Sequence, residues 1–262
     1  MGFLSKWRTH KAVSEHGTVD VSERDGVRYL HLGGVTVQSA MRINAPHELE
    51  LAYTRAMMGF LLFRDVPAKI LMVGLGGGSV AKFVYHKLPS VRTHVVEINP
   101  QVVAAARSHF FLPEADARFQ VEIADGVDYV RAQSAGYDVL MVDGYDDCSL
   151  VEALASQSFY DDCAAALAHD GVLVVNLWGS DKLFDVYLKR IEASFDGLVV
   201  CMTTARLSNI IVFGFKRSPG SPRWQDIKGR AKQLEAEYGL EFLDFVDALR
   251  SLNVHSEKRL LV

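Results

Sequence analysis

From Lys69 onward, short apolar runs alternate with segments whose apolar residues recur every three or four positions. Short runs bounded by turn residues predict buried strands, whereas the three-to-four spacing predicts amphipathic helices. The predicted strands cover residues 70–73, 93–98, 119–123, 137–142 and 172–177. Strands that alternate with helices are typical of a parallel sheet with helices on both faces.

Residues that favour helix ends support this alternation. The predicted helices cover residues 80–88, 100–110, 159–169 and 181–195. Asn99 and Pro100 supply an N-cap and a first-turn proline for the second helix. Gly171 is expected to close the third helix, and Ser180 to cap the fourth.

A last pair of strands, residues 198–203 and 210–215, is separated by too few residues for a crossover helix. Parallel neighbours need a dozen or more connecting residues, so these two strands are expected to form an antiparallel hairpin. The sequence thus predicts an α/β fold with a mostly parallel seven-stranded sheet and an antiparallel terminal hairpin.

The chain before this region has a different pattern. Short alternating runs at residues 18–22, 27–32 and 35–38 are separated by turn residues, which predicts a small antiparallel meander. Apolar residues at helical spacing then predict a long helix over 47–63. We expect three parts: a β element over 1–45, the α/β domain over 46–218, and a helical extension over 219–262 that contains two amphipathic helices.

Composition narrows the possible partners. The 262 residues include 28 Lys and Arg against 32 Asp and Glu, a net charge of −4 that offers no basic field for nucleic acid. The three cysteines and nine histidines form no Cys-x-x-Cys or His-x-x-x-His pattern, which argues against a disulfide framework or a metal site. With no apolar run of about 18 residues and no signal peptide, we expect a cytoplasmic protein without a membrane partner.

A glycine-rich loop, Gly74-Leu75-Gly76-Gly77-Gly78-Ser79, directly follows the first predicted strand of the α/β region. Gly74, Gly76 and Gly78 let the backbone turn tightly and approach a ligand that any Cβ would obstruct. Glu97 lies about twenty residues on, at the end of the next strand, where a carboxylate can accept both hydroxyls of a ribose. The pattern predicts a nucleoside-cofactor site, against the alternative of a plain glycine turn with a solvated Glu97.

Two features favour an adenosyl compound over a dinucleotide. Asp125-Gly126 follows the third strand, where an acidic side chain could bind the adenine amino group. The terminal hairpin also differs from the all-parallel dinucleotide fold. We therefore expect a Rossmann-like fold of the S-adenosylmethionine-dependent transferase kind, with NAD as the minority alternative.

An acidic segment, Asp143-Gly144-Tyr145-Asp146-Asp147, follows the fourth strand of the α/β region. Ligands of open α/β sheets bind beyond the carboxyl ends of the strands. Carboxylates there can attract a cationic substrate and accept its proton. The alternative is an acidic turn that faces solvent.

Taken together, these motifs resemble the spermidine/spermine synthase family of polyamine aminopropyltransferases. The resemblance covers residues 18 to 216 and includes Asp143-x-x-Asp146, the glycine loop and the later Phe159-Tyr160. It implies decarboxylated S-adenosylmethionine as the donor and a diamine such as putrescine as the acceptor. It also implies a homodimer or homotetramer.

The resemblance assigns roles to individual residues. Glu97 would bind the ribose of the donor and Asp125 its adenine, with Gln38 close to the donor. Tyr53 and Asp146 would orient and deprotonate the attacking amine, with Asp143 nearby. The cofactor set implied is thus Gln38, Gly74, Gly76, Gly78, Glu97, Asp125, Gly126 and Asp143, with no metal.

The chain also departs from the family pattern. Gly77 stands where the family usually has an acidic residue that holds the free amine of the donor. The segment before the last strand contains Arg206 and no tyrosine. Two alternatives therefore stay open: a methyltransferase that uses S-adenosylmethionine itself, and a nucleoside-binding protein without turnover.

Overall fold

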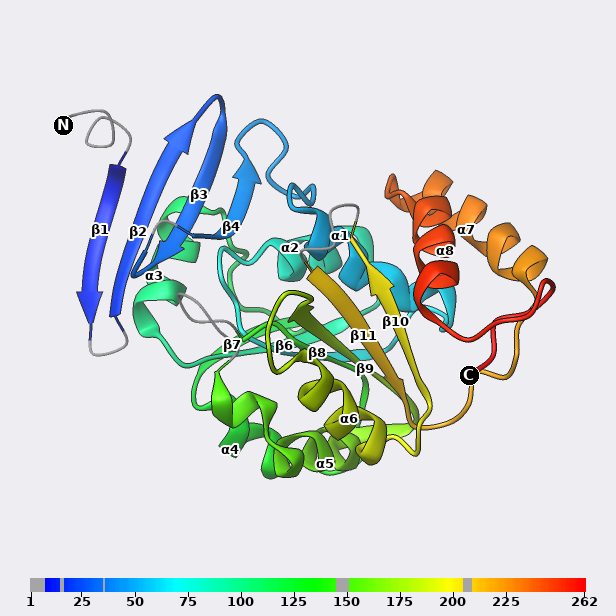
Figure 1. The fold of residues 1–262 in the computed structure, drawn as a ribbon. Helices are drawn as coiled ribbons and strands as arrows, with labels where there is room; N and C mark the ends of the chain where they lie inside the picture. Colours follow the sequence, from blue (N-terminus) through cyan, green and yellow to red (C-terminus); the bar gives the residue numbers. More distant parts are fainter. Residues whose placement is uncertain (1–7, 15–16, 35, 145–150, 205–208) are drawn as a thin grey trace.

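The computed structural model describes residues 8–14, 17–34, 36–144, 151–204 and 209–262. Within these ranges the chain forms a seven-stranded sheet flanked by helices and a separate four-stranded sheet near the N-terminus (Figure 1). No helix in the described ranges is both long and apolar enough to cross a bilayer.

The larger sheet has the strand order β10-β11-β9-β8-β5-β6-β7. Strands β5 to β9 pair in parallel, whereas β11 is antiparallel to both of its neighbours, β9 and β10. The predicted mostly parallel sheet with a terminal hairpin is therefore confirmed. The strands are β5 (Lys69–Val73), β6 (Arg92–Glu97), β7 (Phe119–Ile123), β8 (Tyr137–Val142), β9 (Leu167–Trp178), β10 (Val199–Thr203) and β11 (Asn209–Phe215).

Two groups of helices cover the two faces of this sheet. On one face lie α4 (Gly126–Arg131), α5 (Gln157–Ala166) and α6 (Phe184–Ser194), and their apolar residues form one core cluster with β8 and β9 (Figure 1). The other face is covered by α1 (Ala52–Met57), the 3₁₀ turn η1 (Met58–Leu62), α2 (Ser79–Lys87) and α3 (Pro100–His109). A further short 3₁₀ turn, η2 (Glu152–Ala155), precedes α5.

The N-terminal sheet is an antiparallel meander in the order β1-β2-β3-β4, and β1 and β2 contact α3. Its strands are β1 (Arg8–Ser14), β2 (Gly17–Arg24), β3 (Val27–Leu32) and β4 (Val37–Arg42). The meander is as predicted, but β1 adds a strand that the sequence patterns did not indicate. Its residues, Arg-Thr-His-Lys-Ala-Val-Ser, contain too few apolar positions to produce an alternating signal.

Two helices at the C-terminus, α7 (Trp224–Tyr238) and α8 (Phe242–Leu252), pack against each other. The second also packs against β10, so the predicted amphipathic pair covers the hairpin edge of the sheet. Arg55 of α1 pairs with Glu241 at 2.7 Å, and one continuous apolar cluster includes residues of the meander, the sheet and these two helices.

Three predicted helix limits are wrong. The helix expected over 47–63 begins only at Ala52 and changes to 3₁₀ geometry at Met58, because residues 43–48 form turns after β4. The helix expected over 159–169 ends at Ala166, since β9 begins at Leu167 and pairs with Tyr137 of β8. The helix expected over 181–195 begins at Phe184, so Ser180 is not its N-cap.

Lys82 of α2 is fully buried between the meander and the turn that follows α3. Its Nζ donates to the carbonyl of Phe110 at 2.7 Å and contacts the sulfur of Met41 at 3.0 Å. Burial lowers the pKa of this amine from 10.5 to about 7. Between these two values the unfolded chain binds a proton that the folded chain does not, so stability rises with pH in that window.

We predict that the Lys82 amine contributes about 1 kcal/mol per pH unit to the rise in unfolding free energy between pH 7.5 and 9. Lys82→Met should therefore give a flatter pH dependence than the wild type. Urea unfolding at several pH values measures both slopes. Lys87→Met, which removes a half-exposed lysine of the same helix paired with Glu48, should keep the wild-type slope. Equal slopes for Lys82→Met and the wild type would contradict the prediction.

Candidate active site

The loop between β5 and α2 crosses the carboxyl edge of the parallel sheet. Gly74 adopts a φ of +96°, and a Cβ on this residue would lie 2.3 Å from the carbonyl oxygen of Asp143, at the end of β8. Only glycine allows the two backbones to come this close. The predicted glycine loop and the predicted Asp143 therefore meet at one point of the sheet edge.

Glu97, at the end of β6, is buried under this loop. One carboxylate oxygen accepts the N–H of Leu75 at 2.9 Å, and the other accepts the N–H of Asn99 at 2.8 Å. The side chain thus fixes the loop before it meets any ligand. Each carboxylate oxygen has a second lone pair, which is the capacity that binding of ribose hydroxyls would require.

Asp125 ends the turn after β7 and caps α4, because its Oδ1 accepts the N–H of Val127 at 2.7 Å. A Cβ on the following Gly126 would lie 2.5 Å from Val73. Two apolar residues that the sequence reasoning missed lie at the same edge: Ile98 and Ile123 are 48% and 55% exposed. Exposed apolar side chains beside Glu97 and Asp125 offer a surface on which a flat aromatic ring can bind. Both belong to apolar runs in the sequence, so their exposure gave no signal there.

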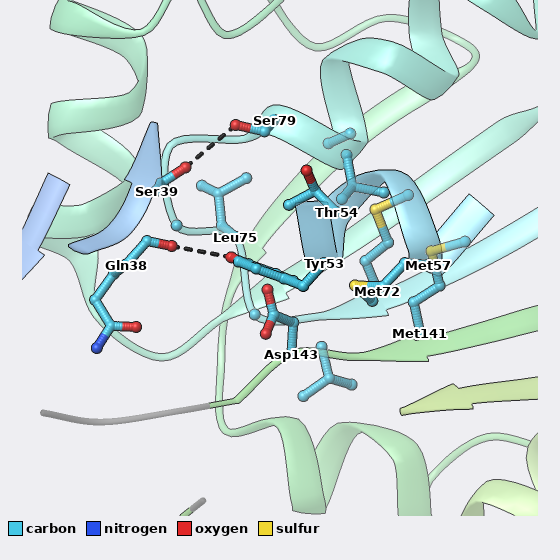
Figure 2. A pocket seen from close by; sticks show the side chains of 15 residues that line it. Gln38, Ser39, Tyr53, Thr54, Met57, Met72, Leu75, Ser79, Met141 and Asp143 are labelled. Atoms are coloured by element: carbon cyan, nitrogen blue, oxygen red, sulfur yellow. Dashed lines mark hydrogen bonds between the residues drawn. The ribbon is translucent and has the colours of Figure 1, made fainter. Parts of the chain in front are cut away.

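A pocket beside the glycine loop brings together three predicted residues from three elements: Gln38 of β4, Tyr53 of α1 and Asp143 (Figure 2). The Tyr53 hydroxyl donates to the main-chain oxygen of Gln38 at 3.0 Å and also has the Asp143 carboxylate as a hydrogen-bonding neighbour. In Figure 2 the ring of Tyr53 lies above Asp143, and Met57, Met72 and Met141 close the pocket on one side.

Two effects shift the pKa of the Asp143 carboxyl in opposite directions. Burial raises the pKa of its carboxyl, and hydrogen bonding by Asn176 and Tyr53 offsets only part of this rise, so the pKa stays above its ordinary value. Burial also raises the pKa of the Tyr53 hydroxyl, an effect that the nearby Asp143 carboxyl increases. Tyr53 therefore remains a neutral hydrogen-bond donor at neutral pH.

A second cavity, of about 450 Å³, adjoins this pocket through Gln38, Tyr53 and Asp143. Asn176 and Trp178 of β9 and Asn209 of β11 also line it. The sequence reasoning missed these three because they come from strands read only as core or edge. The pocket along the glycine loop has a volume of only about 30 Å³, so the second cavity is the one in contact with Asp143 that is large enough for a small molecule.

Asp146, the residue predicted to deprotonate the acceptor, lies outside the described residues, as does Arg206. Within the described ranges no cluster of three or more His, Cys, Asp or Glu side chains could hold a metal ion. Five of the predicted residues line the pocket: Gly74, Gly76, Gln38, Tyr53 and Asp143. Glu97 and Asp125 instead accept backbone N–H groups of the segments around it.

Gly77 lies against packed side chains at the border of the pocket. A Cβ there would lie 2.8 Å from the ring of Phe110 and 2.8 Å from Ser39 Oγ. Gly77 and Phe110 are absent from the residues that line the pocket, whereas Ser39 lines it. The missing side chain at position 77 is thus matched by a fully buried phenylalanine ring.

Comparison with known proteins agrees with this geometry. The family model described as "Spermine/spermidine synthase domain" matches residues 50–215. The chain belongs to the spermine/spermidine synthase family. A polyamine aminopropyltransferase of Chromobacterium violaceum is 42% identical over 255 residues, which cover 97% of this chain and 98% of that protein.

Solved structures of two kinds of enzyme have a fold similar to that of this spermine/spermidine synthase family member. A spermidine synthase in complex with the transition-state analogue AdoDATO has a TM-score of 0.72 at 21% identity, covering 93% of this chain and 84% of that one. Human methyltransferase-like protein 13 in complex with SAH has a TM-score of 0.65 at 29% identity, covering 72% and 93%. The predicted Rossmann-like transferase fold and the predicted family are confirmed.

We predict that Gly77→Ala destabilises this family member by about 1–3 kcal/mol, because the added methyl group overpacks a fully buried site. Urea unfolding measures the change. Gly77→Ala combined with Phe110→Leu should recover part of the loss that the two changes cause separately, since the smaller side chain makes room. Gly229→Ala, at a helix position where an added Cβ meets nothing within 4 Å, is the control and should not destabilise. If Gly77→Ala lowered the unfolding free energy as much in the Phe110→Leu background as in the wild type, the packing argument would be contradicted.

Proposed function

We propose that this protein transfers the aminopropyl group of decarboxylated S-adenosylmethionine to a diamine such as putrescine and releases 5′-methylthioadenosine. The observation that carries the proposal is the meeting of Tyr53 and Asp143 at the glycine loop, in a chain that matches a polyamine aminopropyltransferase over nearly its full length. Family membership supports the reaction class, and the cavity of about 450 Å³ beside Tyr53 and Asp143 supplies a space for a substrate.

The donor would lie along the glycine loop. Glu97 would accept the ribose hydroxyls, and Asp125 would bind the adenine amino group. Ile98 and Ile123 would contact the adenine ring, since their exposed side chains flank these two carboxylates. The glycine backbone at Gly74 and Gly76 would lie against the donor, and Gly78 and Gly126 would permit the tight turns on either side.

The transfer forms a bond between the acceptor nitrogen and the aminopropyl carbon and breaks the bond between that carbon and the sulfonium sulfur. An ammonium has no lone pair, so the acceptor must lose a proton before it attacks. Asp146 would accept that proton as the general base. Asp143 and Tyr53 would orient the nitrogen, Asp143 as an acceptor and Tyr53 through its hydroxyl.

One observation favours a second candidate. No carboxylate projects from position 77, and Phe110 fills the space that a side chain there would need. A donor that keeps its own carboxylate would then meet no repelling acid at this part of the loop. The second candidate is therefore methyl transfer from S-adenosylmethionine, with a different acceptor.

Turnover with two donors separates these functions. We predict 5′-methylthioadenosine release from decarboxylated S-adenosylmethionine and putrescine, and tighter binding of that donor than of S-adenosylmethionine by calorimetry. Tighter binding of the carboxylated donor, with no methylthioadenosine release, would reject aminopropyl transfer. Binding of either donor without transfer to any acceptor would identify a nucleoside-binding protein that lacks turnover.

We predict that Asp146→Asn abolishes transfer while the affinity for 5′-methylthioadenosine changes little, because the amide cannot accept the proton and the proposed role of Asp146 is toward the acceptor. Single-turnover kinetics and calorimetry on the same preparation measure both quantities. Asp185→Asn, at an exposed aspartate in the first turn of α6, is the control and should retain transfer. Normal turnover in Asp146→Asn would show that another group is the base.

We predict that Glu97→Ala weakens 5′-methylthioadenosine binding by about 1.5–3 kcal/mol, the effect of removing a charged hydrogen-bond acceptor. Glu97→Gln should weaken it less, because one oxygen can still accept an N–H of the loop. Glu122→Ala, on the neighbouring strand β7 and paired with His94, should bind like the wild type. Unchanged affinity in Glu97→Ala would rule out a direct contact between this residue and the nucleoside.

A further inference from the structure

Two asparagines connect the start of β11 to Asp143. Asn209 Nδ2 donates to Asn176 Oδ1 at 2.9 Å, and Asn176 Nδ2 donates to Asp143 Oδ1 at 2.8 Å. Asn176 is 2% exposed. The three side chains come from β11, β9 and the end of β8, adjacent strands of the sheet, and all three line the second cavity.

The direction of this chain of hydrogen bonds matters for Asp143. An amide presents an oxygen on one side and an NH₂ group on the other. When Asn209 donates to the Asn176 oxygen, the Asn176 NH₂ group must face the carboxylate. The opposite orientation would place two oxygens against each other unless Asp143 carried a proton. Asn209 thereby selects the Asn176 orientation that favours an ionised Asp143.

Few charged groups compete with this effect. Among the described residues, the titratable group in contact with Asp143 is Tyr53 of α1, which is neutral and can direct its single hydroxyl proton to Gln38 or to Asp143. At the carboxyl end of β5, Asp143 lies against the backbone of Gly74, which carries no charge. Among the described residues, the hydrogen-bonding neighbours of the Asp143 carboxyl are thus neutral, and Asn176 is the one on β9. Asp146 follows three residues later in the sequence, and its charge can be removed with Asp146→Asn.

We propose that Asn176 and Asn209 are positioning residues that keep Asp143 ionised and fix one of its oxygens, so that the carboxylate can orient the amine of the acceptor. This inference rests on the proposed function for the identity of the acceptor. The order of the hydrogen bonds stands without it. Neither asparagine needs to touch the reacting atoms.

The test is the titration of Asp143 itself. The ¹³C resonance of its carboxyl carbon, assigned by its loss in Asp143→Asn, is followed against pH in the wild type, Asn176→Leu and Asn209→Leu. Loss of the Asn176 donor should move the midpoint upward by about one pH unit, the size expected for one hydrogen bond to a charged group. Asn209→Leu should move it in the same direction by less, and the double variant should match Asn176→Leu. Repeating the titration in Asp146→Asn removes the nearby charge and should leave the difference between the variants.

Asn253→Leu is the matched control. Asn253 also makes partly buried amide hydrogen bonds, but to the backbone of Cys201 in β10. Its loss should lower the melting temperature and leave the Asp143 midpoint in place. Should Asn176→Leu fail to fold, Asn209→Leu carries the test, because it leaves Asn176 intact.

Kinetics give a second readout. The acidic limb of kcat/KM should move to higher pH in Asn176→Leu, parallel to the carboxyl midpoint. An unchanged midpoint in Asn176→Leu, or in Asn209→Leu, would overturn the proposal and leave the amides with a structural role only. A wild type without aminopropyl transfer would overturn the proposed function, and the carboxyl titration would still decide the role of the asparagines.

Discussion

The close contact between the backbones of Gly74 and Asp143 organises the site. β5 and β8 are parallel neighbours, so their carboxyl ends reach the same edge. The chain turns at Gly74 so close to β8 that a Cβ there would lie 2.3 Å from the carbonyl oxygen of Asp143. Because that turn is fixed, the loop reaches Glu97 on one side and Tyr53 on the other. The residues proposed to bind the donor and to orient the acceptor thus lie around one close backbone contact, and a methyl group at position 74 would force the two backbones apart.

The pattern of apolar residues predicted the sheet well, because parallel strands buried on both faces appear as continuous apolar runs. It predicted the ends of α5 and β9 poorly. Leu167 and Ala168 fit a helix as well as a strand, and only pairing with β8 decides for the strand. Likewise, β1 becomes a strand through its partner β2, which no local pattern contains.

The site was predictable where its residues follow one another along the chain and not where the sheet brings them together. Glycine spacing indicated the loop, and the position of Glu97 and Asp143 after strands placed them at one edge. Asn176 and Asn209 are 33 residues apart and meet through the antiparallel pairing of β9 and β11. Their contact depends on register, and register is set by the whole sheet.

The packing of Phe110 against Gly77 has a consequence for how this chain can change. Lys82 holds the Phe110 carbonyl, Phe110 occupies the space beside Gly77, and the three are buried together. An acidic residue introduced first at position 77 would overlap the Phe110 ring, whereas a smaller residue introduced first at 110 would leave a cavity beside a glycine. The two substitutions are therefore epistatic, because each is tolerated less well alone than together with the other.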